Sequence, residues 1–321
     1  MTHPVKHVVS VSGGKDSTAL LLLALERCPR DSVIPIFCDT GNEHDAVYEY
    51  LAYLEQALNV RIVRLKADFS EWFSVRRMSI AQDSRIGRDK HGRRKRWTNK
   101  GKRHALSVLY PTGIPYLDLC MLIGRFPSSQ MPFCTQHLKR DVAVSFQTDL
   151  IDRGFNVVSW QGIRREESYR RKNAKKIERI GPNLYAFRPL VDWTVEQVFE
   201  QHRRAGIAPN PIYLQGMPRV GCMPCINCGK AQITEIAARF PEYIVQKAEW
   251  EALVGKASKQ RFSTYFNKGL HGDKTLKHIH EANRIEAVIE WARPSRGGHQ
   301  FDLLTDPIEL DACASSYGLC E

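Results

Sequence analysis

The chain has 321 residues, of which 43% are hydrophobic and 26% are charged. These proportions are typical of a soluble globular protein and exclude a disordered or collagen-like chain. Lys and Arg number 47 against 35 Asp and Glu, so the formal net charge is +12. The longest apolar run, 18–25, is too short to span a bilayer, and the nine cysteines show no regular disulfide spacing. We therefore expect a cytoplasmic protein that makes no membrane contact.

Apolar runs and amphipathic segments alternate along much of the chain. Short apolar runs predict five strands, at 7–11, 32–38, 59–65, 155–160 and 185–190. Longer segments predict five helices, at 15–27, 45–58, 68–80, 135–151 and 194–205. This alternation with short connections predicts an α/β fold with an open, mainly parallel five-stranded sheet and helices on both faces.

Other regions depart from this pattern. Residues 81–104 are polar, basic and without periodicity, which predicts a mobile insertion, and 105–133 permit no assignment. After a loop rich in Pro, Gly and Cys, 231–292 predict mainly helices. We therefore expect an α/β domain over 1–209 and a smaller, helical, cysteine-bearing part over 210–321.

The sharpest motif lies between the first strand and the first helix. It consists of Ser12, Gly13, Gly14, Lys15, Asp16 and Ser17. Two adjacent glycines allow a tight turn with accessible N–H groups, and the helix directs the positive end of its dipole to the same point. The lysine adds a cation and the serines add hydroxyl donors, so the assembly suits a pyrophosphate. It differs from the G-x-x-x-x-G-K-[ST] loop because its glycines are adjacent and Asp follows Lys.

This motif resembles that of the PP-loop ATP pyrophosphatases, also called adenine nucleotide alpha hydrolases. The resemblance implies that the six loop residues bind the β- and γ-phosphates of ATP, with Mg²⁺ bridging phosphate oxygens. It also implies attack at the α-phosphate, release of pyrophosphate and an adenylylated substrate, with Lys15 and Asp16 in catalytic roles.

Two further groups of residues follow predicted strands, at the carboxyl edge where open α/β sheets bind ligands. The first group follows the second strand and consists of Asp39, Thr40 and Gly41. The second group follows the fourth strand and includes Gly162, Arg164, Arg165 and Arg170. Guanidinium groups bind phosphate or sulfate through paired hydrogen bonds, so these arginines are candidates to stabilise developing charge.

Two further strings follow, R-P-L-V-D-W-T at 188–194 and N-P-I-Y at 210–213. Together with the two groups above, they limit the resemblance to one branch of the PP-loop proteins. The series is similar to the phosphoadenosine-phosphosulfate reductase branch and its DNA- and tRNA-sulfurating relatives. The similarity covers about 7–66 and 132–230.

A cysteine cluster follows this series. Cys222, Cys225 and Cys228 are spaced as C-x-x-C-x-x-C, and a fourth ligand would complete either an iron–sulfur site or a structural zinc site. In the branch that the chain resembles, a Cys-Thr-x-x-Leu-Lys string, which Cys134 begins here, contributes to a [4Fe-4S] cluster. The resemblance therefore implies this cluster, with zinc as the alternative metal. Cys320 lies in a Gly-Leu-Cys string that departs from the Glu-Cys-Gly-Leu-His string of sulfonucleotide reductases.

The positive charge is local. Residues 85–104 hold ten Lys and Arg and one acid, residues 164–179 hold eight and three, and the rest of the chain is slightly acidic. The second segment adjoins the predicted nucleotide site. The first has more cations than a small nucleotide needs and indicates binding to a nucleic-acid backbone, where Trp97 could stack on a base.

These observations and the resemblance predict an ATP pyrophosphatase that adenylylates a substrate for sulfur transfer in nucleic-acid sulfuration. DNA phosphorothioate modification is favoured over tRNA thiolation, and a sulfur donor such as a cysteine desulfurase is the expected partner. Two alternatives stay open. One is a sulfonucleotide (APS or PAPS) reductase, and the other is a nucleic-acid-binding module with structural zinc.

Overall fold

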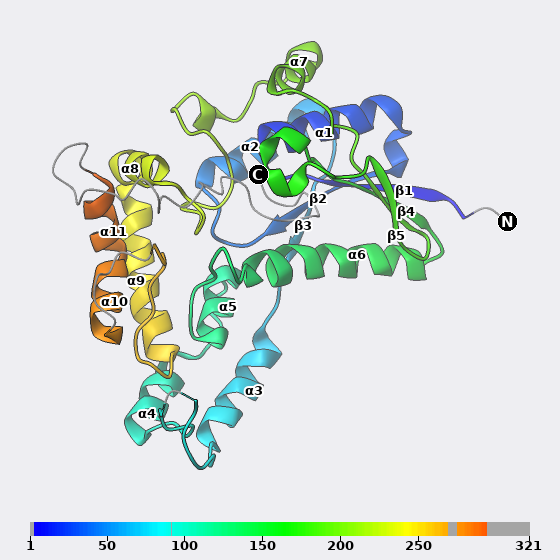
Figure 1. The fold of residues 1–321 in the computed structure, drawn as a ribbon. Helices are drawn as coiled ribbons and strands as arrows, with labels where there is room; N and C mark the ends of the chain where they lie inside the picture. The colour runs from blue at the N-terminus through cyan, green and yellow to red at the C-terminus, as the bar shows by residue number, and fades with distance from the viewer. Residues whose placement is uncertain (1–2, 91, 269–274, 294–321) are drawn as a thin grey trace. The chain divides into compact units, whose positions relative to one another are not determined.

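The computed structural model describes residues 3–90, 92–268 and 275–293 (Figure 1). Within these residues the chain forms two compact units. Unit 1 is built from Met1–Ala67 and Thr135–Gln232, and unit 2 from Asp68–Cys134 and the described part of Ile233–Leu304. This division differs from the expected single boundary after residue 209, because the helices of 68–134 pack against helices near the C-terminus.

Unit 1 contains a six-stranded sheet in the order β3-β2-β1-β4-β6-β5. The strands are β1 (Val5–Ser10), β2 (Val33–Asp39), β3 (Val63–Lys66), β4 (Asn156–Trp160), β5 (Ile177–Gly181) and β6 (Leu184–Phe187). All neighbours pair in parallel except β5 and β6. The expected mainly parallel α/β sheet is confirmed, but it has six strands rather than five. The sequence analysis missed β5 because this edge strand is mostly exposed and polar and has no apolar run.

Helices cover both faces of the sheet (Figure 1). Those of unit 1 are α1 (Lys15–Arg27), α2 (Asp45–Leu58), α6 (Asp141–Asp152) and α7 (Val195–Ala205), with a π-helical turn η2 (Thr135–Arg140) before α6. Short 3-10 turns also occur, at η1 (Arg30–Ser32), η3 (Arg165–Glu167), η4 (Tyr169–Arg171) and η5 (Pro211–Tyr213). On one face, Ala143 and Leu150 of α6 pack in the core against Val8, Ile36 and Val157 of the central strands.

The strand order creates a switch point between β1 and β4. The chain runs outward from β1 through β2 to β3, and then returns to the other side of β1 at β4. Loops that follow two such strands diverge and leave a crevice at the carboxyl edge, where ligands of open α/β sheets bind. The loop at 12–17 follows β1 and the arginine segment at 162–171 follows β4, so both predicted groups lie at this point.

Unit 2 is helical within the described residues. Its helices are α3 (Ser70–Ala81), α4 (Asn99–Val108), α5 (Pro115–Ile123), α9 (Pro241–Ala257), α10 (Leu276–Asn283) and α11 (Ile285–Ala292), while α8 (Lys230–Arg239) crosses the division between the units. Tyr116 of α5 stacks on Trp250 of α9 with ring centroids 5.8 Å apart. The sequence analysis missed α5 because it is almost entirely buried and apolar on every side, so it has no amphipathic period.

The basic insertion is more ordered than expected. Its last residues form the first part of α4, which begins after Thr98, whose hydroxyl accepts the N–H of Gly101 at 3.0 Å. In the part of the chain that the structure describes, no helix combines the length and hydrophobicity needed to cross a membrane.

Candidate functional site

The loop after β1 turns sharply into α1. Gly13 has a φ of +82°, and a Cβ at this position would lie 3.1 Å from Cγ1 of Val47. Gly14 is the N-cap of α1. The Ser17 hydroxyl donates to the Gly14 carbonyl at 3.1 Å and accepts the N–H of Ser12 at 3.1 Å. These bonds hold the loop around the N-terminus of α1, where the helix dipole favours an anion.

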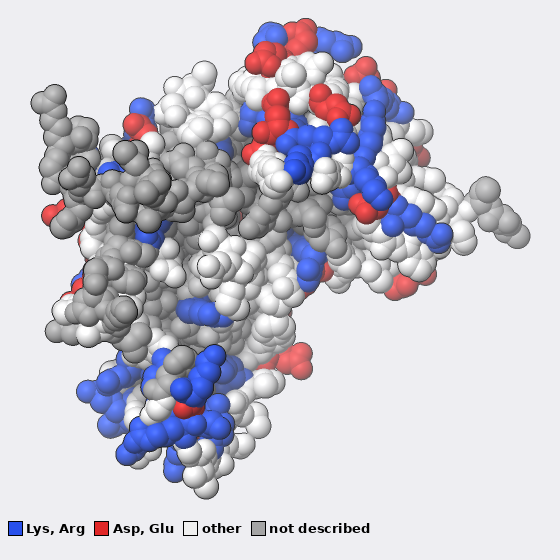
Figure 2. Space-filling view, in the orientation of Figure 1, with Lys and Arg blue, Asp and Glu red and all other residues white. Residues whose placement is uncertain are grey.

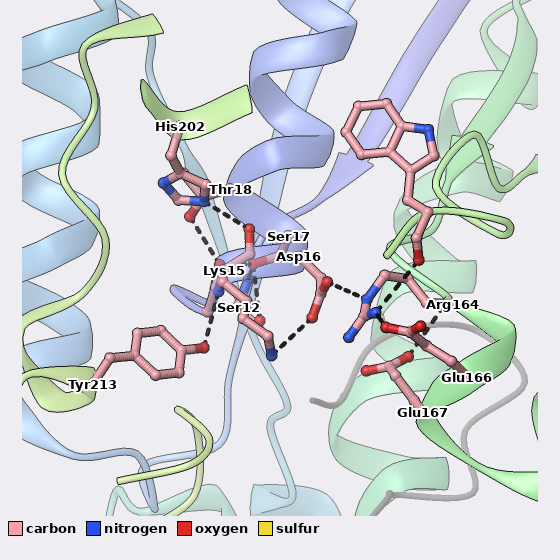
Figure 3. A network of polar contacts seen from close by, with 12 residues as sticks. Ser12, Lys15, Asp16, Ser17, Thr18, Arg164, Glu166, Glu167, His202 and Tyr213 are labelled. Atoms are coloured by element: carbon pink, nitrogen blue, oxygen red, sulfur yellow. Dashed lines mark hydrogen bonds and ion pairs between the residues drawn. The ribbon is translucent and has the colours of Figure 1, made fainter. Parts of the chain in front are cut away.

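Asp16 lies between two cations at this helix terminus (Figure 3). Its Oδ2 is 3.1 Å from Nζ of Lys15, and its Oδ1 is 2.6 Å from Nε of Arg164. Arg164 also forms an ion pair with Glu166, and its N–H donates to Glu167 at 3.1 Å. Burial lowers the pKa of Arg164, but the carboxylates of Asp16, Glu167 and Glu166 outweigh that effect and raise it. Asp16 therefore pairs with two cations, one from the loop and one from the segment after β4.

The other residues of the arginine segment are placed differently. A Cβ at Gly162 would lie 3.5 Å from backbone atoms at the start of α1, so glycine allows this close approach. Arg165 is partly exposed, where it forms an ion pair with Asp192 and donates to the carbonyl of Ala174. Arg165 thus holds its own loop. Arg170 lies in η4, and its side chain is outside the described part of the structure.

Three residues that the sequence analysis gave no role contact the loop, and Figure 3 shows two of them, His202 and Tyr213. The Tyr213 hydroxyl accepts the N–H of Lys15 at 3.0 Å, and the amide of Asn210 donates to the carbonyl of Gly13 at 3.2 Å. Nε2 of His202 lies 2.9 Å from the carbonyl of Lys15, so this nitrogen carries the proton. Burial lowers the pKa of His202, which favours the neutral ring. The N-P-I-Y string could have indicated two of these residues, whereas nothing local marked His202.

The predicted residues after β2 shape the turn at the edge of the sheet. Oδ1 of Asp39 accepts the N–H of Gly41 at 2.9 Å and the hydroxyl of Tyr48 at 2.8 Å. The Thr40 hydroxyl donates at 2.8 Å to Glu43, a buried carboxyl that the sequence analysis did not single out. Burial raises the pKa of Glu43. The turn is thus stabilised by two carboxyl groups at the carboxyl edge of the strand next to β1.

The cysteine loop is joined to this turn by backbone hydrogen bonds. The Met223 N–H donates to the carbonyl of Asn42 at 2.8 Å, and the His44 N–H donates to the carbonyl of Gly221 at 3.3 Å. This pairing brings the start of the C-x-x-C-x-x-C segment to the carboxyl edge of β2.

The thiol groups themselves do not form a ligand set in this structure. Cys222 and Cys225 are half-buried and Cys228 is buried, while Cys134 belongs to unit 2. The seven described cysteines form no disulfide, and no three His, Cys, Asp or Glu side chains among the described residues are grouped to hold a metal ion. The metal site therefore stays a prediction, and no reaction step is derived through it. Cys320 lies outside the described residues.

Comparison with known families identifies the group to which this fold and loop belong. The phosphoadenosine phosphosulfate reductase domain matches residues 6–228, which is more than half of the chain. The chain belongs to this family. The loop at 12–17, the arginine segment and the cysteine loop all lie within the matched region.

Individual relatives of this reductase-family chain cover it to different extents. An uncharacterized 37.8 kDa protein of Escherichia phage 186 is 41% identical over 326 residues, covering 98% of this chain and 96% of the relative. Adenosine 5'-phosphosulfate reductase of Rhizobium meliloti is 32% identical over 80 residues, which are 25% of this chain and 30% of that protein. The crystal structure of the Candida auris phosphoadenylyl-sulfate reductase in its phosphate complex aligns with a TM-score of 0.40 and 14% identity, over 68% of this chain and 82% of that one.

Unit 2 of this reductase-family chain carries many Lys and Arg side chains over α4 and the loop that precedes it (Figure 2). We call the ten Lys and Arg side chains of 85–104 the basic surface; nine are exposed and Lys102 is half-buried. Asp83 accepts the Nε–H of Arg85 at 2.7 Å and the backbone N–H of Trp97 at 2.7 Å. The Trp97 side chain is only 5% exposed, so the expectation that it stacks on a base is wrong.

Proposed function

We propose that this chain is an ATP pyrophosphatase that adenylylates a nucleic acid for sulfur transfer. The observation that carries the proposal is the arrangement at the N-terminus of α1, where Lys15 and Arg164 flank the buried carboxylate of Asp16. The Lys15 ammonium, a helix dipole and a glycine turn meet at one point, which suits the binding of a pyrophosphate, and the Asp16–Arg164 pair fixes this point. The same point is the switch point of the sheet, where nucleotides bind in open α/β folds.

In the proposed reaction, an oxygen atom of the substrate attacks the α-phosphorus of ATP. The bond from this phosphorus to the oxygen that bridges it to the β-phosphate breaks, and pyrophosphate leaves with Mg²⁺. Lys15 neutralises charge that develops on the leaving group, while Arg164, buried against Asp16, fixes the segment after β4 beside the loop. Hydrosulfide, released by a thiol from the persulfide of a cysteine desulfurase, then displaces AMP, so that sulfur replaces the attacking oxygen.

The basic surface supports a polymeric substrate. Nine exposed cations within twenty residues provide contacts for several successive phosphates, each of which releases counterions when it is neutralised. A small sulfonucleotide offers only a few phosphate or sulfate groups and does not need such a surface. DNA is preferred to tRNA as the acceptor because of the resemblance to DNA-sulfurating proteins.

A second candidate is the reduction of a sulfonucleotide. The match of 80 residues to an adenosine 5'-phosphosulfate reductase favours it. In this reaction, which needs neither ATP nor nucleic acid, a thiol such as Cys320 would attack the sulfur of adenylyl sulfate and release AMP. An external dithiol would then release sulfite from the S-sulfonated cysteine and be oxidised to a disulfide. Deleting the last eight residues and assaying sulfite release separates this candidate from the first, because only the reductase would lose activity on adenylyl sulfate.

The experiment that tests the first proposal is an assay of pyrophosphate release from ATP, with and without DNA or tRNA. We expect DNA to stimulate release and Lys15→Ala to abolish it. Lys6→Ala is the matched control, because Nζ of Lys6 contacts the carbonyl of Asp31 rather than the phosphate loop. Equal activity of the two variants would contradict the role of the loop, and a nucleic-acid-binding module with structural zinc would release no pyrophosphate at all.

A further inference from the structure

An exposed tyrosine in unit 2 is held beneath a fixed guanidinium group. Cζ of Arg77, on α3, lies 4.0 Å from the ring centroid of Tyr110, which follows α4. The side chain of Tyr110 is 53% exposed, although the guanidinium covers part of its ring. A tyrosine that is this exposed contributes little to the core and leaves part of its ring accessible to a partner.

The pair is rigid because both of its members are anchored to the end of α4. Nη1 of Arg77 donates to the carbonyl of Leu106 at 2.7 Å and to the carbonyl of Leu109 at 3.2 Å. The N–H of Tyr110 donates to the carbonyl of Val108 at 2.8 Å. The guanidinium therefore satisfies carbonyls near the helix C-terminus while its cation–π contact holds the ring. A fixed planar ring loses little conformational entropy when it binds a second planar group.

The pair lies at the end of α4, a helix that carries three side chains of the basic surface. Arg103 of α4 is exposed and precedes the last residue of the helix, Val108, by five residues, or about 7.5 Å along the axis, and Tyr110 follows two residues later. A nucleic acid whose phosphates contact Arg103 thus passes within reach of the Tyr110 ring. Trp97 cannot serve as the stacking residue, because it is buried.

We propose that Tyr110, supported by Arg77, is a stacking platform for an unpaired base of the nucleic acid that the basic surface binds. The inference rests on the proposed function and adds a substrate feature to it, namely a base that is single-stranded or displaced from its helix. Every base has a π-face, so such a platform selects unpaired bases without selecting sequence. Arg77 is a positioning residue here, because its plane and its bonds to the α4 carbonyls keep the ring in place.

The test compares binding of a labelled single-stranded 20-mer and of the corresponding duplex to the full chain. We expect Tyr110→Ala to weaken single-strand binding about 5- to 150-fold, which corresponds to the loss of one base–aromatic stack. Duplex binding should change less than about two-fold, and Tyr110→Phe should bind like the wild type. The slope of log K against log salt should be unchanged, since no charge is removed.

Two further variants control for folding and exposure. Ile86→Ala removes an apolar side chain that is 92% exposed within the same basic segment, and we expect it to bind like the wild type. Arg77→Lys keeps the charge but loses the planar group, and we expect a loss that is smaller than that of Tyr110→Ala. Thermal unfolding of each variant shows that the comparison is between folded proteins.

The outcomes separate this inference from the proposed function. If the wild type binds both nucleic acids and Tyr110→Ala binds the single strand equally well, the stacking platform is refuted and the nucleic-acid partner stands. A similar loss for Ile86→Ala would also overturn the platform, because it would show that any exposed apolar group has this effect. If the wild type binds neither nucleic acid, both proposals fail.

Discussion

Asp16 and Arg164 form a buried ion pair between residues that are 148 positions apart in the chain. Nε of Arg164 lies 2.6 Å from Oδ1 of Asp16, and the two side chains are 4% and 0% exposed. The pair joins the first turn of α1 to the segment that follows β4. It therefore connects the two loops on either side of the switch point. It also holds in place the cations of the candidate pyrophosphate site.

The first prediction concerns the contrast between Arg164 and its neighbour Arg165. Arg164→Ala removes the closer of the two cations that flank the buried carboxylate of Asp16 and leaves Lys15, so we expect it to lower the free energy of unfolding by up to about 3–5 kcal/mol. Arg165→Ala removes a partly exposed pair with Asp192, and we expect a loss of at most about 1 kcal/mol. Denaturant unfolding of both variants measures the difference. Equal losses would show that the buried Asp16–Arg164 pair stabilises the fold no more than the exposed Arg165–Asp192 pair does.

The second prediction concerns the basic surface. Neutralising Arg93, Arg94, Lys95 and Arg96 together removes up to four phosphate contacts, so we expect weaker nucleic-acid binding with a shallower dependence on salt. The slope of log K against log salt should fall by about 0.9 for each contact with a duplex that is lost. Binding of ATP, measured by calorimetry, should be unchanged. A variant with the wild-type slope would exclude these side chains from the interface.

The third prediction concerns the pH dependence of stability. In unit 2, burial raises the pKa of Glu251 from its ordinary value near 4.5 to about 7, although its carboxylate accepts the N–H groups of Tyr265 and Ile285. The folded state thus binds this proton more tightly than the unfolded state does. The stabilisation is present below pH 4.5 and is lost as the pH rises through 7.

Glu251→Gln should remove this contribution. We expect the stability of the variant relative to the wild type to be higher at pH 8 than at pH 5, by about 2 kcal/mol. Denaturant unfolding at the two pH values provides the measurement. If the difference between the two proteins is the same at both values, Glu251 does not titrate in this range.

The fourth prediction concerns the cysteine loop. If Cys134, Cys222, Cys225 and Cys228 bind a [4Fe-4S] cluster, anaerobically purified protein should be brown and contain about four iron atoms and labile sulfide. Cys225→Ser should lose the iron and the colour, whereas Cys28→Ser, outside this set, should keep both. Colourless wild-type protein with one zinc ion would replace the cluster by a structural zinc site.

Much of unit 1 could be predicted because its elements are encoded locally. The periodicity of 15–27 and 45–58 predicted α1 and α2 with the bounds that the structure shows. The adjacent glycines likewise marked the phosphate loop. Each of these signals is contained in fewer than twenty consecutive residues, and none depends on a distant partner.

What was missed depends on contacts between distant residues or on burial without a period. The basic composition around Trp97 suggested that its side chain is exposed. In the structure, Asp83, 14 positions earlier, accepts the backbone N–H of Trp97, and a Cβ at Gly101 would lie 3.3 Å from the indole ring. The ion pair of Asp16 with an arginine after β4 could not be predicted, because no local sequence pattern connects the two residues. The sequence also did not show that unit 2 combines two separate segments, 68–134 and the described residues after 232. Their helices pack together only in the folded chain.

The most direct test of the central claim is to determine which bond of ATP breaks. The protein is incubated with Mg²⁺, DNA and ATP labelled at either the α- or the γ-phosphate, and the products are separated. We predict that the α-label appears in AMP or attached to the nucleic acid, and that the γ-label appears in pyrophosphate. Recovery of the γ-label as inorganic phosphate together with the α-label in ADP would contradict the account, as would intact ATP.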